Sequence, residues 1–66
     1  MISYKPLISL LFDRQITKMQ LKDAVGFSSA TLAKISKNKY VSLQTIESIC
    51  KYLNCKIEDV IEIKFD

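Results

Sequence analysis

The chain has 66 residues, of which 48% are hydrophobic and 26% charged, and it contains no His and no Trp. A chain of this length forms one domain and buries only roughly 60% of the surface that its unfolded form exposes. Nearly all of its apolar side chains are therefore needed for one small core, which leaves little room for the cleft of an enzyme. The two Cys are too few for a four-ligand zinc site without carboxylates. We expect a single domain over residues 1–66 that is not an enzyme and that holds no cofactor and no metal.

The cellular location follows from what the N-terminal segment and the cysteines exclude. Residues 2–12 contain no apolar stretch long enough for a signal peptide or a membrane span. Two Cys allow at most one disulfide, unlike the disulfide framework of small secreted domains. We therefore expect a cytoplasmic protein that has no membrane partner.

The formal charge of +3 is unevenly distributed along the chain. Residues 14–41 contain six basic residues and one acidic residue, whereas residues 42–66 contain three Lys and five acidic residues. A basic segment of this kind suits a polyanionic partner such as nucleic acid. A solvated, lysine-rich surface is the alternative, and charge alone does not decide between the two.

Four helices are predicted from apolar residues that recur at spacings of three and four. They lie near residues 5–14, 18–25, 29–37 and 43–53. The chain has one Gly and one Pro, which indicates helices joined by tight turns. Pro6 suits the first turn of the first helix, where its missing N–H would have no intrahelical partner.

Hydroxyl side chains mark the starts of the later helices. Thr17 and Gln20 have the spacing of a capping box, in which each side chain accepts a hydrogen bond from the other residue's backbone N–H. Ser28 and Ser42 precede the third and fourth helices in the same way, each following an apolar residue. Three such starts in one short chain support the helix assignment.

The C-terminal part has a different pattern. Asn54 is suited to end the fourth helix in a left-handed conformation, and residues 56–60 are long enough for one short further turn. In the last six residues, apolar and charged side chains alternate with the period of an edge strand. A frayed tail is the alternative for this segment; its apolar residues are Ile61, Ile63 and Phe65.

The second and third helices are separated by a very short turn that contains Gly26. The chain must leave the second helix with a positive φ, which only Gly adopts without strain. The apolar residues on both sides of the turn are expected to fix the angle between the helices: Leu21, Val25, Phe27, Leu32 and Ile35. The pattern predicts a helix-turn-helix.

The stretch from residue 18 to residue 37 resembles the twenty-residue motif of the Cro/cI-type, XRE-like family of bacterial and phage repressors, with Gly26 at its ninth place. The following segment, SLQTIESICKYLNCKIEDVIE, looks like the next helix and the short last helix of that family. Lys22 departs from the pattern, because the family usually has a small residue four places before the glycine. The resemblance covers nearly the whole chain and implies an all-α fold, a compact five-helix bundle.

The resemblance also implies a function, which is sequence-specific binding of double-stranded DNA by a small transcriptional regulator, a repressor, in a bacterial or phage setting. The third helix, near 29–37, would enter the major groove and contact base edges. The residues implied as base contacts are Ser29, Ala30, Thr31, Ala33, Lys34 and Lys37. Lys34 can donate to guanine, and the methyl groups of Ala30, Ala33 and Thr31 can contact thymine. Small residues filling the helix surface and a solvated lysine are the alternatives.

Phosphate contacts are expected on both sides of this helix, because helix N-termini offer free N–H groups and a favourable dipole to anions. The residues concerned are Lys18, Gln20, Ser28, Lys39, Tyr40 and Ser42. For each Lys, ordinary solubilising charge is the alternative. The Tyr residues are scattered, which favours packing or rim positions over a platform that stacks single-stranded bases.

A homodimer is expected, because one recognition helix covers only a few base pairs. Symmetric pairing would set two third helices roughly 34 Å apart on a pseudo-palindromic operator. The predicted dimer surface consists of Ile61, Ile63 and Phe65, which would add a strand to the partner's tail; the alternative is pairing with the chain's own residues 1–3. The alternative function is a protein-interaction module, such as an antitoxin or adaptor with a protein partner.

Overall fold

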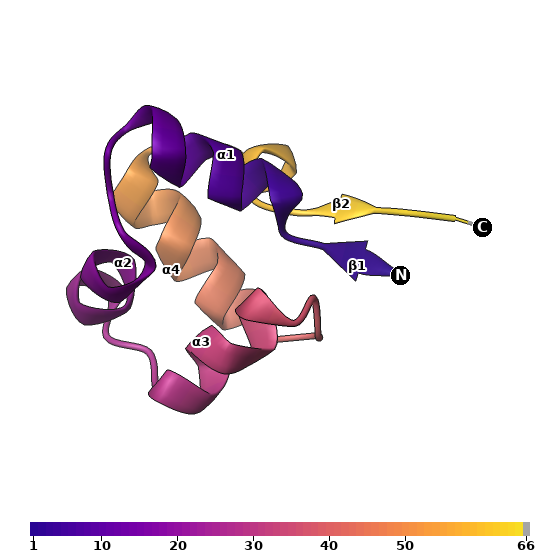
Figure 1. Cartoon of the computed structure of the whole chain (residues 1–66), viewed down its shortest axis with the longest axis horizontal. Helices are drawn as coiled ribbons and strands as arrows, with labels where there is room; N and C mark the ends of the chain where they lie inside the picture. Colours follow the sequence, from indigo (N-terminus) through magenta and orange to yellow (C-terminus); the bar gives the residue numbers. More distant parts are fainter. Residues whose placement is uncertain (66) are drawn as a thin grey trace.

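A computed structural model describes residues 1–65. In chain order the elements are β1 (Ile2–Ser3), α1 (Lys5–Asp13), α2 (Lys18–Val25), α3 (Ser29–Ser36), α4 (Leu43–Leu53), one turn of 3-10 helix η1 (Ile57–Asp59), and β2 (Glu62–Ile63). The four predicted helices are confirmed, with each end within one residue of the expected position. In Figure 1, α1 crosses above α4, α2 and α3 lie to the left and below, and the two strands project together to the right. Within residues 1–65, no helix has the length and apolarity needed to cross a membrane.

The predicted count of five helices is wrong, because the last helical element is a single 3-10 turn. It begins where the Lys56 N–H donates to the carboxylate of Asp59 at 3.0 Å. It ends at Val60, whose carbonyl accepts a hydrogen bond from the N–H of Leu7 at 3.2 Å. This bond turns the chain toward the start of α1, so residues 60–65 run back along the N-terminus instead of continuing a helix.

The C-terminal tail forms a strand with the chain's own N-terminus. β1 and β2 pair antiparallel, with Ile2 opposite Ile63. The Lys64 N–H donates to the Met1 carbonyl at 2.8 Å, and the Met1 ammonium donates to the Lys64 carbonyl at 2.9 Å. The tail is therefore neither frayed nor unpaired: it forms a strand that pairs with the chain's own N-terminal residues 1–3, one of the predicted alternatives. The fold remains in the all-α class, with one small sheet added.

The core lies around α4, which crosses the middle of the molecule in Figure 1. Ile46, Ile49 and Leu53 are buried on one face of α4, at spacings of three and four. The other elements cover this face with buried side chains, which are Ile2, Tyr4, Leu7, Leu11, Leu21, Ile35 and Val60. Each large apolar side chain buried in this way contributes about 1.5–3 kcal/mol, so one core of ten residues carries most of the stability.

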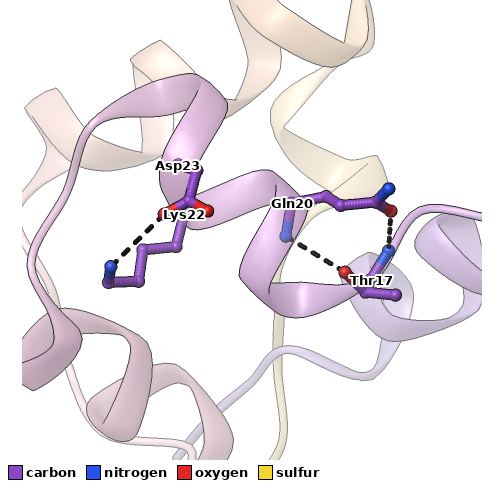
Figure 2. A network of polar contacts seen from close by, with 4 residues as sticks. All are labelled: Thr17, Gln20, Lys22 and Asp23. Atoms are coloured by element: carbon purple, nitrogen blue, oxygen red, sulfur yellow. Dashed lines mark hydrogen bonds and ion pairs between the residues drawn. The ribbon is translucent and has the colours of Figure 1, made fainter.

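The helix starts have the predicted caps. Figure 2 shows the capping box before α2, in which Thr17 Oγ1 accepts from the Gln20 N–H at 3.0 Å and Gln20 Oε1 accepts from the Thr17 N–H at 2.8 Å. Ser28 and Ser42 cap α3 and α4, each accepting the N–H of the residue three places later at 3.1 Å. The capping prediction is confirmed at all three helices.

Each helix is followed by a residue with positive φ, and these residues are Gln15, Gly26, Asn38 and Asn54. The left-handed ends at Gly26 and Asn54 are as predicted, whereas those at Gln15 and Asn38 are not among the sequence predictions. After α1, α3 and α4, the next residue closes a Schellman motif by donating to the carbonyl five residues earlier. These bonds run from Ile16 to Leu11, from Lys39 to Lys34 and from Cys55 to Cys50, at 2.9, 2.8 and 3.0 Å.

Candidate nucleic-acid interface

The turn between α2 and α3 is built on Gly26. Its φ is 91°, and its N–H donates to the Lys22 carbonyl at 2.7 Å, which closes the last turn of α2. A Cβ added at this position would have no heavy atom within 4 Å. Gly is therefore required by the backbone conformation and not by lack of space. Only Phe27 and Ser28 separate it from α3, which confirms the tight helix-turn-helix.

Lys22 occupies the place where the family motif usually has a small residue. Its side chain is only 19% exposed, and its ammonium lies 3.5 Å from the carboxylate of the adjacent Asp23 (Figure 2). A partly buried lysine packs its aliphatic stem against neighbours while its charge stays near water. Because Asp23 is exposed, this ion pair adds little stability, and the departure is accommodated within the same helix-turn-helix.

One side of α3 is exposed and consists of small and basic residues. Thr31 is half-buried, and both its N–H and its hydroxyl oxygen are hydrogen-bonded to Ser28 Oγ at 3.1 Å. Leu32 is half-buried and Ile35 is buried on the core side. Apart from Ser36, which lies beside Lys18, the exposed residues from 29 to 37 recur with the period of a helix and so share one face. We call it the α3 face, and its residues are Ser29, Ala30, Ala33, Lys34 and Lys37. The structure brings all of the predicted base-contact residues except Thr31 onto this exposed face.

Two lysines meet at the end of α3. Asn38 has a φ of 55°, which reverses the chain so that the Lys39 N–H reaches the Lys34 carbonyl at 2.8 Å. At such a helix end, the residue that donates and the residue whose carbonyl accepts are commonly a pair of apolar side chains in contact. The corresponding pair after α1 is apolar, since Leu11 is buried in the core and Ile16 packs against it. After α3 the pair is Lys34 and Lys39, and both are exposed. Two exposed lysines whose backbones are hydrogen-bonded to each other put two positive charges on one edge of the surface, which favours a polyanion there.

The start of α2 adds polar groups beside the end of α3. The Lys18 ammonium lies 3.5 Å from Ser36 Oγ, so this lysine is directed to the last turn of α3. Gln20 is exposed, and its Oε1 already accepts a bond in the capping box. A contact from Gln20 to a phosphate would therefore use its amide N–H groups, which are donors.

The start of α4 presents a second group of polar residues. Lys39, Tyr40 and Ser42 are all exposed. Ser42 Oγ accepts from the Thr45 N–H. The N–H groups of the two residues before Thr45, Leu43 and Gln44, have no acceptor within the helix, because they belong to its first turn. Such N–H groups and the helix dipole favour an anion. All six predicted phosphate-contact residues are exposed. Lys18 contacts the last turn of α3, Ser28 precedes α3, and Lys39, Tyr40 and Ser42 follow it, whereas Gln20 lies within α2 and has no contact with α3 among those described.

Tyr4 is a residue of this region that sequence reasoning did not connect to the site. Its side chain is 1% exposed, its N–H donates to Asn38 Oδ1 at 3.0 Å, and its hydroxyl donates to the Lys39 carbonyl at 2.6 Å. Burial raises the pKa of the Tyr4 phenol, and a backbone hydrogen bond at Val41 opposes that shift. No sequence signal links residue 4 to residues 34 and 35 places later. The one available signal is that Asn38 follows a helix and that Asn adopts a left-handed conformation more readily than most residues.

The remaining chemically active side chains lie away from the α3 face. Cys50 and Cys55 are half-buried free thiols that pack against the core. Burial raises the pKa of Cys55, and the neighbouring Cys50 raises it further. Within residues 1–65, no three His, Cys, Asp or Glu side chains gather as metal ligands do.

Comparison with known proteins agrees with this geometry. The family model of the Cro/C1-type HTH DNA-binding domain matches residues 7–66. The chain is 36% identical over 59 residues to an uncharacterized HTH-type transcriptional regulator, YozG, of Bacillus subtilis (strain 168), a match that covers 86% of this chain and 70% of that protein. Its fold is similar to a crystal structure of the transcriptional regulator VanUg (Form II), with a TM-score of 0.95 and 46% identity over 98% of this chain and 87% of the other. With nearly its whole length matched, the chain belongs to the Cro/C1-type helix-turn-helix family of DNA-binding domains.

Proposed function

We propose that the chain is a sequence-specific transcriptional regulator that inserts α3 into the major groove of DNA and represses by occupying its operator. The observation that carries this proposal is the α3 face, which is exposed, is lined by small and basic residues, and ends in the joined pair Lys34 and Lys39. The family match and the regulator relatives support it.

Base reading would depend on the α3 face. An α-helix fits the major groove of B-DNA, where all four base pairs have distinct donor and acceptor patterns. Lys34 would donate to guanine O6 or N7, and the methyl groups of Ala30 and Ala33 would contact thymine. Ser29 and Lys37 lie on the same face, one near each end of α3. Thr31, which is half-buried at the edge of this face, would contribute its methyl group; its hydroxyl oxygen accepts a hydrogen bond from the Ser28 hydroxyl.

Phosphate binding would flank this contact on two sides. Lys18 and Gln20 at the start of α2, with Ser28 before α3, would hold one part of the backbone. Lys39, Tyr40 and Ser42 would hold another, next to the free N–H groups of α4. Each phosphate neutralised by a lysine releases counterions, so the affinity would fall steeply with salt.

A homodimer would place two α3 helices on a pseudo-palindromic operator in the cytoplasm. Ile63 and Phe65 are exposed on the tail and would form the dimer surface. Ile61 is half-buried against the chain's own core and would contribute only at the edge of that surface. Binding of two half-sites doubles the number of base contacts, which a domain of this size needs for tight specific binding.

The test is selection of bound sequences from a pool of random duplexes, followed by binding measurements at several salt concentrations. We expect an enriched inverted repeat whose affinity falls as salt increases. Enrichment of no sequence, with no salt-dependent binding to any duplex, would overturn the proposal. That outcome would favour the alternative of a protein-interaction module, which has no need of an exposed basic segment.

A further inference from the structure

We propose that Tyr4 is a positioning residue for DNA binding: it holds the turn between α3 and α4 so that Lys39 and Tyr40 face the phosphate backbone. We call residues 38–41 the α3–α4 turn. This inference rests on the proposed function, and it assigns a role to a residue that lies outside the helix-turn-helix motif.

Two hydrogen bonds connect Tyr4 to Asn38 and Lys39, the first two residues of the α3–α4 turn. The Tyr4 N–H donates to Asn38 Oδ1 at 3.0 Å, and the Tyr4 hydroxyl donates to the Lys39 carbonyl at 2.6 Å. The ring between these two donors is 1% exposed and belongs to the core. Tyr4 therefore holds two consecutive residues of the turn, Asn38 through its backbone N–H and Lys39 through its side-chain hydroxyl.

Tyr4 is itself fixed on both sides along the chain. Ser3 pairs with Glu62 in the sheet, and Lys5 begins α1. The Tyr4 carbonyl accepts the N–H of Ile8 in the first turn of α1, at 3.0 Å. The α3–α4 turn is thus attached to an element that has little freedom to move.

Without Tyr4, fewer attachments would hold the turn. Asn38 and Lys39 donate to the carbonyls of Ile35 and Lys34 at 3.2 and 2.8 Å, which ties these two residues to the end of α3. Val41, the last residue of the turn, packs against the core. The bond from Tyr4 holds the Lys39 carbonyl against a buried ring, while Lys39 itself is exposed. A turn that is ordered before binding loses less conformational entropy when it contacts phosphate.

The main variant is Tyr4→Phe, which removes the hydroxyl and keeps the ring in the core. We expect the affinity for duplex to fall about 3- to 10-fold, the effect of one lost hydrogen bond. The slope of log affinity against log salt should become less negative by up to about 1, as when one phosphate contact is lost. Tyr52→Phe is the matched control, since Tyr52 lies on α4 and is exposed, and it should bind as the wild type does.

A double-mutant cycle with Lys39→Ala decides whether Tyr4 acts through the turn. Lys39→Ala keeps the backbone carbonyl, so it leaves the bond from Tyr4 intact. If Tyr4 positions Lys39, then Tyr4→Phe will weaken binding less in the Lys39→Ala background than in the wild type. Fully additive losses, or wild-type binding by Tyr4→Phe, would overturn the positioning role. If Lys39→Ala weakens binding while Tyr4→Phe does not, the proposed function stands and this inference fails; if the wild type binds no duplex, both fail.

A second variant, Asn38→Gly, tests the same role if Tyr4→Phe does not fold. Asn38→Gly retains the left-handed conformation and removes the acceptor for the Tyr4 N–H. For both variants, circular dichroism should report a folded protein, and amide exchange at residues 39–41 should be faster than in the wild type without DNA. Unchanged exchange at these amides in both folded variants would contradict a role in holding the turn.

Discussion

Ile63 lies directly opposite Ile2 in the two-stranded sheet, yet Ile63 is 52% exposed and Ile2 only 7%. Ile61 and Phe65 stand two residues before and two residues after Ile63, the spacing that puts side chains of an extended chain on one face, although the strand itself covers only Glu62–Ile63. That face covers the core at Ile61 and continues beyond it, until Phe65 is 90% exposed. The tail thus completes the monomer with its first part and leaves an apolar surface on its second part.

The first prediction is that this surface forms the homodimer. Phe65→Ser should convert a dimer into a folded monomer, because the ring is exposed and contributes little to the monomer core. Light scattering at micromolar concentration measures the mass. Phe12→Ser is the matched control, since Phe12 is 82% exposed on α1, away from the sheet, and should leave the dimer intact. A wild-type mass that corresponds to a monomer would refute the predicted dimer.

The second prediction separates base contacts from phosphate contacts at the end of α3. Lys39→Ala should weaken binding to all duplexes alike and reduce the magnitude of the salt slope by about 1. Lys34→Ala should cost roughly 1–3 kcal/mol at one base pair and relax the preference there. Titrations of both variants against a set of single-base operator changes make the comparison. Uniform losses for both would remove Lys34 from the base contacts.

The third prediction concerns the turn of the helix-turn-helix. Gly26→Val should lower the free energy of unfolding by more than about 1 kcal/mol, because a β-branched residue tolerates a φ of 91° poorly. Gly26→Asn should cost less, since Asn adopts left-handed conformations more readily. Urea denaturation measures both. The structure offers room for a side chain here, so equal losses for Val and Asn would show that the conformation is not what requires Gly.

The fourth prediction is a loss of stability at alkaline pH. Burial raises the pKa of Cys55 above 9.0 and that of Tyr4 above 10.0 in the folded protein. The unfolded chain therefore releases these protons first, and the free energy of unfolding should decrease as the pH rises through about 9 and above. Cys55→Ser should decrease less steeply than the wild type in urea denaturation across this range. If the free energy of unfolding of the wild type increased with pH in this range, the prediction would be contradicted, because burial of neutral acidic groups requires it to decrease.

Local chemistry made the helices and their starts predictable from the sequence. Thr17, Ser28 and Ser42 bond to backbone groups three residues away, so spacing alone identifies them. Gly26 and Asn54 were recognisable because few other residues adopt a positive φ. The residues of the α3 face were instead predicted from the resemblance to the Cro/cI-type family, and the structure places five of the six predicted base contacts on the exposed side of α3.

Long-range contacts account for what the sequence did not predict. Gln15 has a φ of 58° although Gln has no special tolerance for it; the next residue, Ile16, packs against the core and closes the end of α1. The expected fifth helix is shortened by a hydrogen bond between Val60 and Leu7, far apart in the chain. The contacts of Tyr4 with the α3–α4 turn are of the same kind, because only the folded core brings residue 4 beside residues 38 and 39.

The most direct test of the central claim is a dimethyl sulfate protection experiment on a duplex selected by the protein. Guanine N7 lies in the major groove and adenine N3 in the minor groove, so the two sites report on different grooves. With α3 in the major groove, guanine N7 within each half-site should be protected and adenine N3 should stay reactive. Lys34→Ala should remove the protection at one guanine in each half-site. Protection of adenine N3 alone, or a bound duplex with fully reactive guanine N7, would contradict major-groove recognition by α3.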